Sequence, residues 1–177
     1  MRSGLIIFLQ ILLTLPAFVS CFTEEDITSG QTDIITVGQQ LPDFSVRMND
    51  GTQVSPSSLS GKPAVIVFFH TGCSDCRKEL PVVQRVYDEC SSLASFVCIS
   101  RAEDETAVAA YWQAEKLSLP YSAQPDKTVY QKFAWQTIPR IYVADAAGMV
   151  RYVFVEQVSY KRLSEAVKGV LSGSELE

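Results

Sequence analysis

A short apolar segment that runs directly into a pair of cysteines is the feature that most limits how this chain folds. Residues 64–69 read AVIVFF, and residues 70–76, HTGCSDC, follow them without a break. A continuous run of β-forming apolar residues is typical of a central strand that is buried on both faces. The strand is expected to end near His70 and the next helix to begin near Cys73. Cys73 and Cys76 therefore lie where a buried strand passes into a helix.

The rest of the chain alternates strand and helix patterns, which is typical of an α/β fold. Two short extended runs flank a hairpin turn signal at residues 49–51. The elements expected after it are strand 64–69, helix 73–90, strand 95–100, helix 104–116, short helix 127–133, hairpin 140–155 and helix 160–171. Pro81 lies inside the first long helix and is expected to bend it. Crossover helices make strands parallel and cover both faces of the sheet, and the closing hairpin makes that sheet mixed.

The amino-terminal segment has the pattern of an export signal. Arg2 precedes the apolar run LIIFLQILLTLPAF, which is too short for a comfortable membrane span, and Ser20 precedes Cys21. A small residue before a cysteine, after such a run, resembles a bacterial lipobox. That resemblance implies cleavage before Cys21 and lipid on its sulfur, which would bind the lipid bilayer. The alternative is a plain secretory signal that is cleaved nearby. Both interpretations place the mature protein outside the cytoplasm.

Composition limits the class of the protein and its partners. The 177-residue chain is 47% hydrophobic and 20% charged, which is typical of a globular domain, and its net charge of −5 argues against nucleic acid as a partner. We predict a signal peptide at residues 1–20, a flexible polar tether at 21–36 and one domain at 37–174. The acidic residues just after Cys21 resemble a surface-export signal, or are simply a solvated linker. The expected location is the envelope of a Gram-negative bacterium, on the periplasmic side or at the cell surface.

The position of the two cysteines predicts redox chemistry, although a C-x-x-C motif alone is a weak signal. The free amides and the dipole at a helix N-terminus favour an anion at Cys73. Thiolate is the nucleophilic form of cysteine. Cys76 lies one turn deeper, within bonding reach of Cys73, and is expected to be the buried resolving thiol. The pair is therefore predicted to exchange electrons with disulfides.

A metal site would need more ligands than the sequence offers near the pair. Zinc takes four ligands, yet His70 is the sole histidine and Cys90 and Cys98 have no metal-ligand spacing. We therefore expect no metal and no cofactor. Cys90 and Cys98 are expected to be buried thiols that behave as small apolar side chains, and a second disulfide between them is the alternative. His70 is expected to line the site.

The motifs together resemble the TlpA/ResA-like branch of membrane-tethered thiol-disulfide oxidoreductases with a thioredoxin fold. The matching pieces are GQQLPDF, LSGKPAVIVFF, CSDCRKELP, TIPRIYVADAAG and the closing helix, which together span about residues 37–171. The resemblance implies an α/β, thioredoxin-like fold. This fold has a central mixed β-sheet flanked by helices, with an N-terminal β-hairpin extension and a central α insert.

The resemblance also assigns a substrate-docking position. In this family a cis-proline faces the C-x-x-C pair, and the residue before it pairs its backbone with the bound polypeptide. Ile138 and Pro139 match that position here, just before the strand RIYVA. A cis peptide bond is accessible at low cost only before proline. The alternative is an ordinary trans-proline at a strand start. Trp135, which lies close by in sequence, is expected to line the substrate groove.

The same branch supplies a glutamate from the loop after the second central strand, and CISRAEDE places Glu103 there. The resemblance implies that Glu103 relays the proton of Cys76 during exchange. The alternative is an acid that only stabilises a helix N-terminus. Gly72 and Asp75 stand where the family usually has Trp and Pro. Gly72 is expected to open the approach for substrate. Asp75 adds a negative charge worth ~1 kcal/mol beside the thiolate, which favours a reductant.

The expected reaction starts with attack of Cys73 on a protein disulfide, which Cys76 then resolves. The implied partners are protein disulfide or dithiol substrates and a membrane electron donor, and we expect a monomer. One alternative is a redox-inactive binding or assembly module on the same fold. Another is a peroxiredoxin-like peroxidase, but in peroxiredoxins a Thr or Ser lies three residues before the reactive cysteine. This chain has His70 there.

Overall fold

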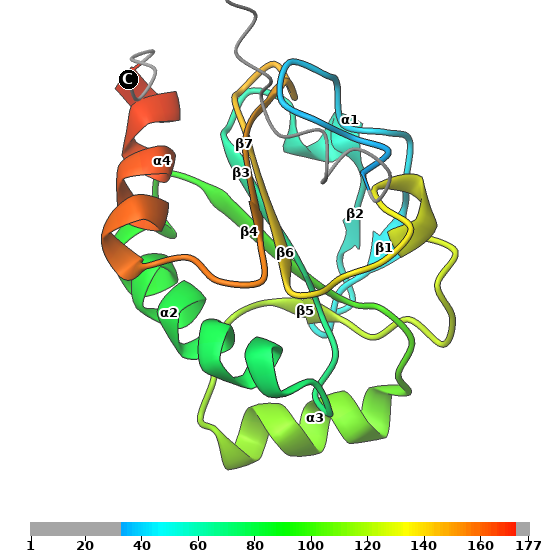
Figure 1. The fold of residues 1–177 in the computed structure, drawn as a ribbon. Helices are drawn as coiled ribbons and strands as arrows, with labels where there is room; N and C mark the ends of the chain where they lie inside the picture. The colour runs from blue at the N-terminus through cyan, green and yellow to red at the C-terminus, as the bar shows by residue number, and fades with distance from the viewer. Residues whose placement is uncertain (1–32, 173–177) are drawn as a thin grey trace, which may run out of the picture.

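The apolar run before the cysteines forms the central strand of the sheet, as predicted. The computed structural model describes residues 33–172, and its main sheet has five strands in the order β5-β4-β3-β6-β7 (Figure 1). Strand β3 (Ala64–Phe69) is buried along its whole length. It pairs in parallel with β4 (Ser95–Ser100) and antiparallel with β6 (Arg140–Ala144). The strands β5 (Tyr121–Ser122) and β7 (Val150–Val155) form the two edges. The sheet is therefore mixed, which confirms the prediction.

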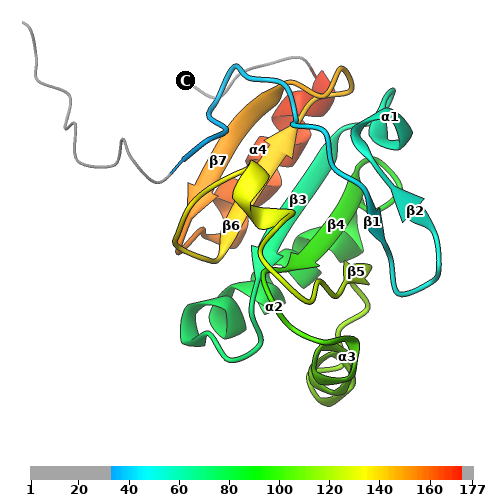
Figure 2. The same ribbon diagram turned by 90° about the vertical axis from the view of Figure 1, so that its right-hand side faces the viewer.

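Helices and short elements cover the two faces of this sheet. Helices α2 and α4 lie on one face, whereas the β1–β2 hairpin and the 3₁₀ turn η1 lie on the other (Figures 1 and 2). Their bounds are β1 Val46–Arg47, β2 Gln53–Val54, α1 Pro56–Leu59, α2 Ser74–Cys90, α3 Glu105–Ala114, η1 Tyr130–Lys132 and α4 Tyr160–Ser172. Helix α2 starts directly after β3, so the sheet and helix together fix the position of the cysteines.

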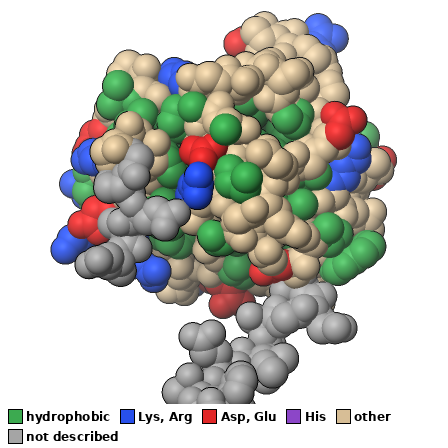
Figure 3. Space-filling model, turned by 90° about the horizontal axis from the view of Figure 1, so that it is seen from above, with side chains coloured by type: hydrophobic (Ala, Val, Ile, Leu, Met, Phe, Trp, Pro, Cys, Tyr) green, Lys and Arg blue, Asp and Glu red, His purple; other side chains and the backbone are tan. Residues whose placement is uncertain are grey.

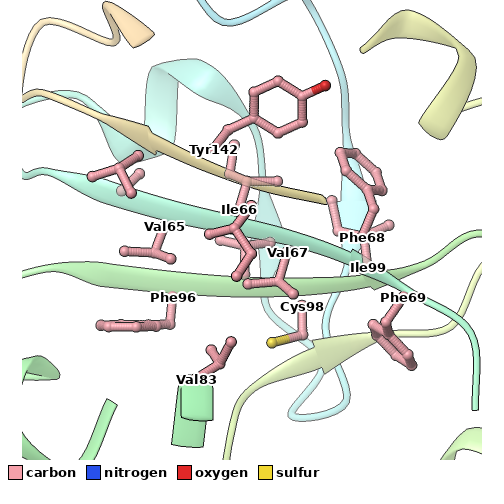
Figure 4. Close-up of a cluster of buried hydrophobic side chains, with 14 of the residues drawn as sticks. Val65, Ile66, Val67, Phe68, Phe69, Val83, Phe96, Cys98, Ile99 and Tyr142 are labelled. Atoms are coloured by element: carbon pink, nitrogen blue, oxygen red, sulfur yellow. The ribbon is translucent and has the colours of Figure 1, made fainter. Parts of the chain in front are cut away.

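Neighbouring residues at the end of β3 point to opposite faces of the sheet, because side chains alternate along a strand. Phe68 packs against the rings of Tyr130 and Phe133 on the η1 face. Phe69 instead packs against Trp112 of α3, with 4.8 Å between ring centroids. The side chains of both faces of β3 and β4 form one continuous apolar core (Figure 4). The end of β3 that precedes His70 is therefore held by aromatic packing on both faces of the sheet.

Two short elements differ from the sequence expectation. Strand β5 consists of Tyr121–Ser122 alone and pairs with Cys98 and Ile99 of β4. Two residues carry no readable periodicity, so the pattern gave no strand there. The helix expected at residues 127–133 is a single 3₁₀ turn, Tyr130–Lys132. In both places contacts with the main sheet decide the local structure.

The amino-terminal part of the described chain lies against the loop that follows η1. The backbone amides of Ile34 and Ile35 both donate to the carbonyl of Phe133 at 3.0 Å. Farther along, the Gly38 amide donates to the Val150 carbonyl at 2.8 Å. The signal peptide predicted at residues 1–20 and the lipidation site predicted at Cys21 lie outside the described residues.

The surface gives no sign of a bilayer-spanning element in the part of the chain that the structure describes. No helix there has the length and apolar character needed to cross a membrane. The face seen in Figure 3 shows hydrophobic side chains scattered among polar and charged ones, with acidic and basic groups side by side. This face therefore offers no broad field of one charge.

Candidate active site

The two cysteines of the motif lie at the start of α2 in different environments. Cys73 is the N-cap residue of the helix and is partly exposed, and its thiol donates to the Ile138 carbonyl at 3.7 Å between sulfur and oxygen. Cys76 lies in the first turn of the helix with 0% of its surface exposed. Both are free thiols. The structure therefore presents one sulfur to incoming molecules and keeps the other beneath it.

The environment of Cys76 holds its thiol in the protonated form. Burial is the largest influence and raises the pKa of Cys76 far above the usual value, and a hydrogen bond with Cys73 raises this pKa further. The backbone of His70 and the charge of Arg101 act in the opposite direction and lower the pKa of Cys76. Cys76 must therefore lose a proton before it can act as a nucleophile, since thiolate is the reactive form.

The other two cysteines of the described chain lie elsewhere in the core. Cys90 ends α2 and Cys98 lies in β4, and both are buried free thiols. Burial raises the pKa of each thiol. Both therefore have the character of small apolar side chains.

Glu103 reaches from the loop after β4 to the turn before Cys73. Its side chain is only 6% exposed. One carboxylate oxygen accepts from the Thr71 amide at 2.8 Å, and the other accepts from the Thr71 hydroxyl. These contacts place the Glu103 carboxylate beside residues 70–72, where Thr71 is its hydrogen-bond donor. The carboxylate thus holds the turn that leads to Cys73.

The sole histidine belongs to the same turn. The imidazole Nδ1 of His70 accepts a hydrogen bond from the Gly72 amide at 3.0 Å and lies 3.5 Å from a carboxylate oxygen of Glu103. A Cβ atom at Gly72 would lie 3.2 Å from two atoms of this ring. The absence of a side chain at Gly72 therefore makes room for the imidazole.

The predicted docking residues lie opposite Cys73. The peptide bond between Ile138 and Pro139 is cis. Both residues are buried, but the Ile138 carbonyl contacts the Cys73 thiol. Trp135 is 62% exposed, which is unusual for so large an apolar side chain. All three residues belong to the loop between η1 and β6. This one loop therefore carries both the exposed indole of Trp135 and the carbonyl that contacts Cys73.

A fully buried arginine, which the sequence analysis did not single out, supports this docking loop from within. The Nε atom of Arg140 donates to the carbonyls of Gln136 and Thr137 at 3.1 and 2.9 Å. Its guanidinium also pairs with Asp33 of the amino-terminal segment. The Tyr130 hydroxyl donates to the same Thr137 carbonyl at 2.9 Å. A charged residue at the start of an otherwise apolar strand was the available signal.

The charged residues around the motif are arranged in local pairs. Asp75 forms an ion pair of 2.8 Å with Lys78, one turn farther along α2. Arg77 lies 3.9 Å from Glu115 and 5.6 Å from the ring centre of Tyr111, so it leans toward α3. The negative charge of Asp75 is therefore offset by Lys78 and not by Arg77.

A buried glutamate on α2 is a second residue that the sequence analysis missed. Glu79 is 7% exposed and accepts from the Val158 amide at 3.2 Å. Burial is the main influence and raises the pKa of this carboxyl above its usual value. Glu79 lies three residues after Cys76, a spacing that puts two side chains on one face of a helix. That spacing was the signal in the sequence.

Other parts of the described chain offer less chemistry. Among residues 33–172, no three or more His, Cys, Asp or Glu side chains gather in a way that could hold a metal ion. A cavity of about 360 Å³ lies between the β1–β2 hairpin, β5 and the start of α3. None of the predicted site residues lines it. The cysteine pair and its turn therefore remain the centre of the candidate site.

Known proteins that resemble this chain include a thioredoxin-like protein and thiol-disulfide oxidoreductases. The chain is 25% identical over 134 residues to the thioredoxin-like protein YneN of Bacillus subtilis (strain 168), covering 74% of this chain and 78% of that protein. It is 22% identical over 172 residues to the thiol-disulfide oxidoreductase ResA of Bacillus thuringiensis (strain Al Hakam), covering 97% of each.

A solved structure and a family model agree with these relatives. A thiol:disulfide interchange protein of the thioredoxin family from Chlorobium tepidum TLS superposes with a TM-score of 0.67 at 28% identity, covering 77% of this chain and 99% of that one. The predicted thioredoxin-like fold and the resemblance to ResA-like proteins are thereby confirmed. The model described as the AhpC/TSA family matches residues 37–153, about two thirds of the sequence, and the chain belongs to that family.

Proposed function

We propose that this protein is a thiol-disulfide oxidoreductase that uses the Cys73 and Cys76 dithiol to reduce disulfides of cell-envelope proteins. The observation that carries the proposal is the contrast between the two sulfur atoms. Cys73 is partly exposed and contacts the Ile138 carbonyl. Cys76 is buried, and its thiol lies within hydrogen-bonding reach of Cys73. This arrangement suits a reaction in which one thiol meets the substrate and the second one releases it.

The reaction has two exchange steps. The Cys73 thiolate attacks one sulfur of a substrate disulfide, so a mixed disulfide forms and the other substrate sulfur leaves as a thiolate. Cys76 then loses its proton and attacks the sulfur of Cys73. A Cys73–Cys76 disulfide forms, and the second substrate sulfur leaves as a thiolate. The substrate gains two electrons, the protein loses two, and a membrane electron donor returns them to the protein.

Substrate docking is proposed for the loop before β6. The Ile138 carbonyl, which now accepts from the Cys73 thiol, becomes available to the substrate backbone once Cys73 is bonded to the substrate. The exposed ring of Trp135 offers an apolar surface for a side chain of the bound polypeptide. Pro139 and Gly72 complete the contact region on either side of Cys73.

We propose that Glu103 takes up the proton of Cys76 in the resolving step. Its nearly buried carboxylate binds Thr71, the neighbour of the residue whose backbone contacts the Cys76 sulfur. The contacts with Thr71 also give Glu103 a second task, because they hold the turn before Cys73 in place. The first task serves the resolving step of Cys76, and the second keeps Cys73 in position for the first exchange.

The same environment supports a reducing role. Burial raises the pKa of Cys76, so the reduced pair gains no extra stability from an ionised second sulfur. Oxidising pairs are those whose reduced form is stabilised. We therefore propose that this pair gives electrons to its substrates. The proposed location is the cell envelope, with the protein held at the bilayer by lipid on Cys21, as the lipobox-like sequence implies.

Trapping of substrate tests the proposal. In Cys76→Ser, the first exchange step proceeds and the second does not, so mixed disulfides accumulate and are seen as reductant-sensitive adducts in envelope extracts. Cys73→Ser is the matched control and forms none of these adducts. The purified wild-type protein is expected to reduce a protein disulfide when supplied with electrons. A wild-type protein that fails to do so would be a redox-inactive module, and the proposal would be wrong.

A further inference from the structure

The imidazole of His70 has two neighbours that require different protonation states. Its Nδ1 atom accepts from the Gly72 amide at 3.0 Å, which requires a lone pair on that nitrogen. The same Nδ1 atom lies 3.5 Å from a carboxylate oxygen of Glu103. A hydrogen bond to that oxygen requires a proton on the nitrogen. One ring nitrogen cannot meet both demands at once, so the two contacts exclude each other.

The backbone contacts of the turn show what the imidazole holds. Three successive amides donate: that of Thr71 to Glu103, that of Gly72 to the His70 ring, and that of Cys73 to the His70 carbonyl at 3.0 Å. The His70 ring is thus one of three supports for the turn that presents the nucleophile. Because Gly72 itself is exposed, its amide is free to bind water if the ring withdraws.

The surroundings allow the ring to change charge. The His70 side chain is 35% exposed, whereas that of Glu103 is 6% exposed. Histidine is the side chain that changes its charge between about pH 5 and 8. Of the charged groups, Glu103 from the loop after β4 contacts the ring itself, while Cys73 and Cys76 at the start of α2 contact the His70 backbone, and the charge of Arg101 acts on Cys76.

We propose that His70 is a positioning residue whose protonation state sets the turn before Cys73 and thereby the reactivity of that thiol. The neutral ring holds the Gly72 amide. The protonated ring releases that amide, donates to Glu103 and places a positive charge beside the turn. The inference deepens the proposed function, on which it rests for its biological meaning. The charge state of the His70 ring should then change the reactivity of Cys73.

Nuclear magnetic resonance tests the coupling without any substrate. His70 is the only histidine of the chain, so its ring signal is unambiguous in reduced protein purified without a histidine tag. The Gly72 amide is expected to shift between pH 4.5 and 9 with the same midpoint as the His70 ring. A Gly72 amide that does not follow the ring would overturn the proposal.

Alkylation rates test the consequence for Cys73. In a Cys76→Ser background, His70→Asn keeps an acceptor near the place of Nδ1 but cannot titrate, and His70→Ala removes the acceptor. Below pH 6 the protein with His70 should react with iodoacetamide about threefold faster than the Asn variant, because a nearby positive charge favours thiolate. Above pH 8 these two should agree, whereas the Ala variant departs from both.

Coincident pH profiles for His70 and its Asn variant would refute the proposal. This outcome is distinct from failure of the proposed function. A protein that traps no substrate through Cys73 fails the exchange experiment, yet its turn can still respond to His70. A protein that does trap substrate but shows an unresponsive Gly72 amide retains the proposed function and loses only the role of His70.

Discussion

Cys73 and Cys76 are one helical turn apart, yet the protein gives their sulfur atoms opposite surroundings. Cys73 caps the helix and meets the docking loop, while Cys76 lies under it without solvent contact. This difference arises from the helix geometry, because position 76 is on the face of α2 that packs on the sheet. A single turn of helix thus separates a partly exposed sulfur from a buried one.

The buried thiol should resist alkylation when its partner is removed. In Cys73→Ser, Cys76 is expected to react with iodoacetamide only at a higher pH than an ordinary cysteine needs, because burial raises the pKa of Cys76. At pH 7 its rate should be at least about tenfold below that of a free thiol. Mass spectrometry of samples quenched between pH 6 and 10 gives the rates, and unfolded protein in urea serves as the control. An equal rate in folded and unfolded protein would contradict the assigned burial.

Glu79 should make stability depend on pH. Burial raises the pKa of this carboxyl in the folded protein, so the folded state binds a proton more tightly than the unfolded state. Its contribution is therefore fully present below the unfolded pKa and is lost as pH rises through the folded pKa. Glu79→Gln keeps an acceptor for Val158 and removes the charge. We expect a higher Tm than wild type at pH 8 and no difference at pH 4, measured by calorimetry.

At the scale of elements, the loop between η1 and β6 is held by contacts that are distant in sequence. Arg140 binds two carbonyls of the loop and pairs with Asp33, more than a hundred residues earlier in the chain. The Cys73 turn is likewise held by Glu103, from the loop after the next strand. The two loops that meet at the reactive sulfur are therefore both fixed by long-range polar contacts.

Removal of Arg140 should loosen the docking loop and destabilise the fold. Arg140→Met leaves the carbonyls of Gln136 and Thr137 without this donor and Asp33 without its partner, and loss of one member of a buried pair costs about 3–5 kcal/mol. Urea unfolding gives the free energy. The control is Arg151→Met, since Arg151 pairs with Asp145 at a site where the arginine is 40% exposed, and an exposed pair contributes about 0–1 kcal/mol. Equal losses in the two variants would contradict a special role for the buried pair.

The sequence could predict those features that depend on residues close together along the chain. The run AVIVFF, the helix after it and the closing hairpin carry their own periodic patterns, so their positions were readable. The partners of Glu103 and Arg140 depend on how loops meet across the sheet, which no local pattern records. Glu103 itself was found through a family resemblance, while the contacts of His70 with Gly72 and Glu103 needed coordinates.

At the scale of the whole molecule, the redox state of one pair is linked to the stability of the entire domain. Cys76 lies in the same apolar core as β3, so its environment is set by the packing of the sheet against α2. A disulfide that is favoured in the folded protein must, by linkage, stabilise the folded protein in return. The redox state that the folded protein favours therefore also determines which form of the protein is more stable.

The oxidised protein should be more stable than the reduced one if the pair is a reductant. We expect a higher Tm for the oxidised form, and an equilibrium potential against glutathione more negative than about −230 mV, the lower limit for glutaredoxins. Calorimetry of both forms and alkylation after glutathione equilibration provide the two numbers. A reduced form with the higher Tm would instead identify an oxidant.

The amide contacts of Ile34 and Ile35 with Phe133, and the ion pair of Asp33 with Arg140, have a mechanical consequence. They attach the start of the described chain to the same loop that meets Cys73. A pull along the amino-terminal segment would therefore act on both ends of the loop that contacts Cys73, at Phe133 and at Arg140.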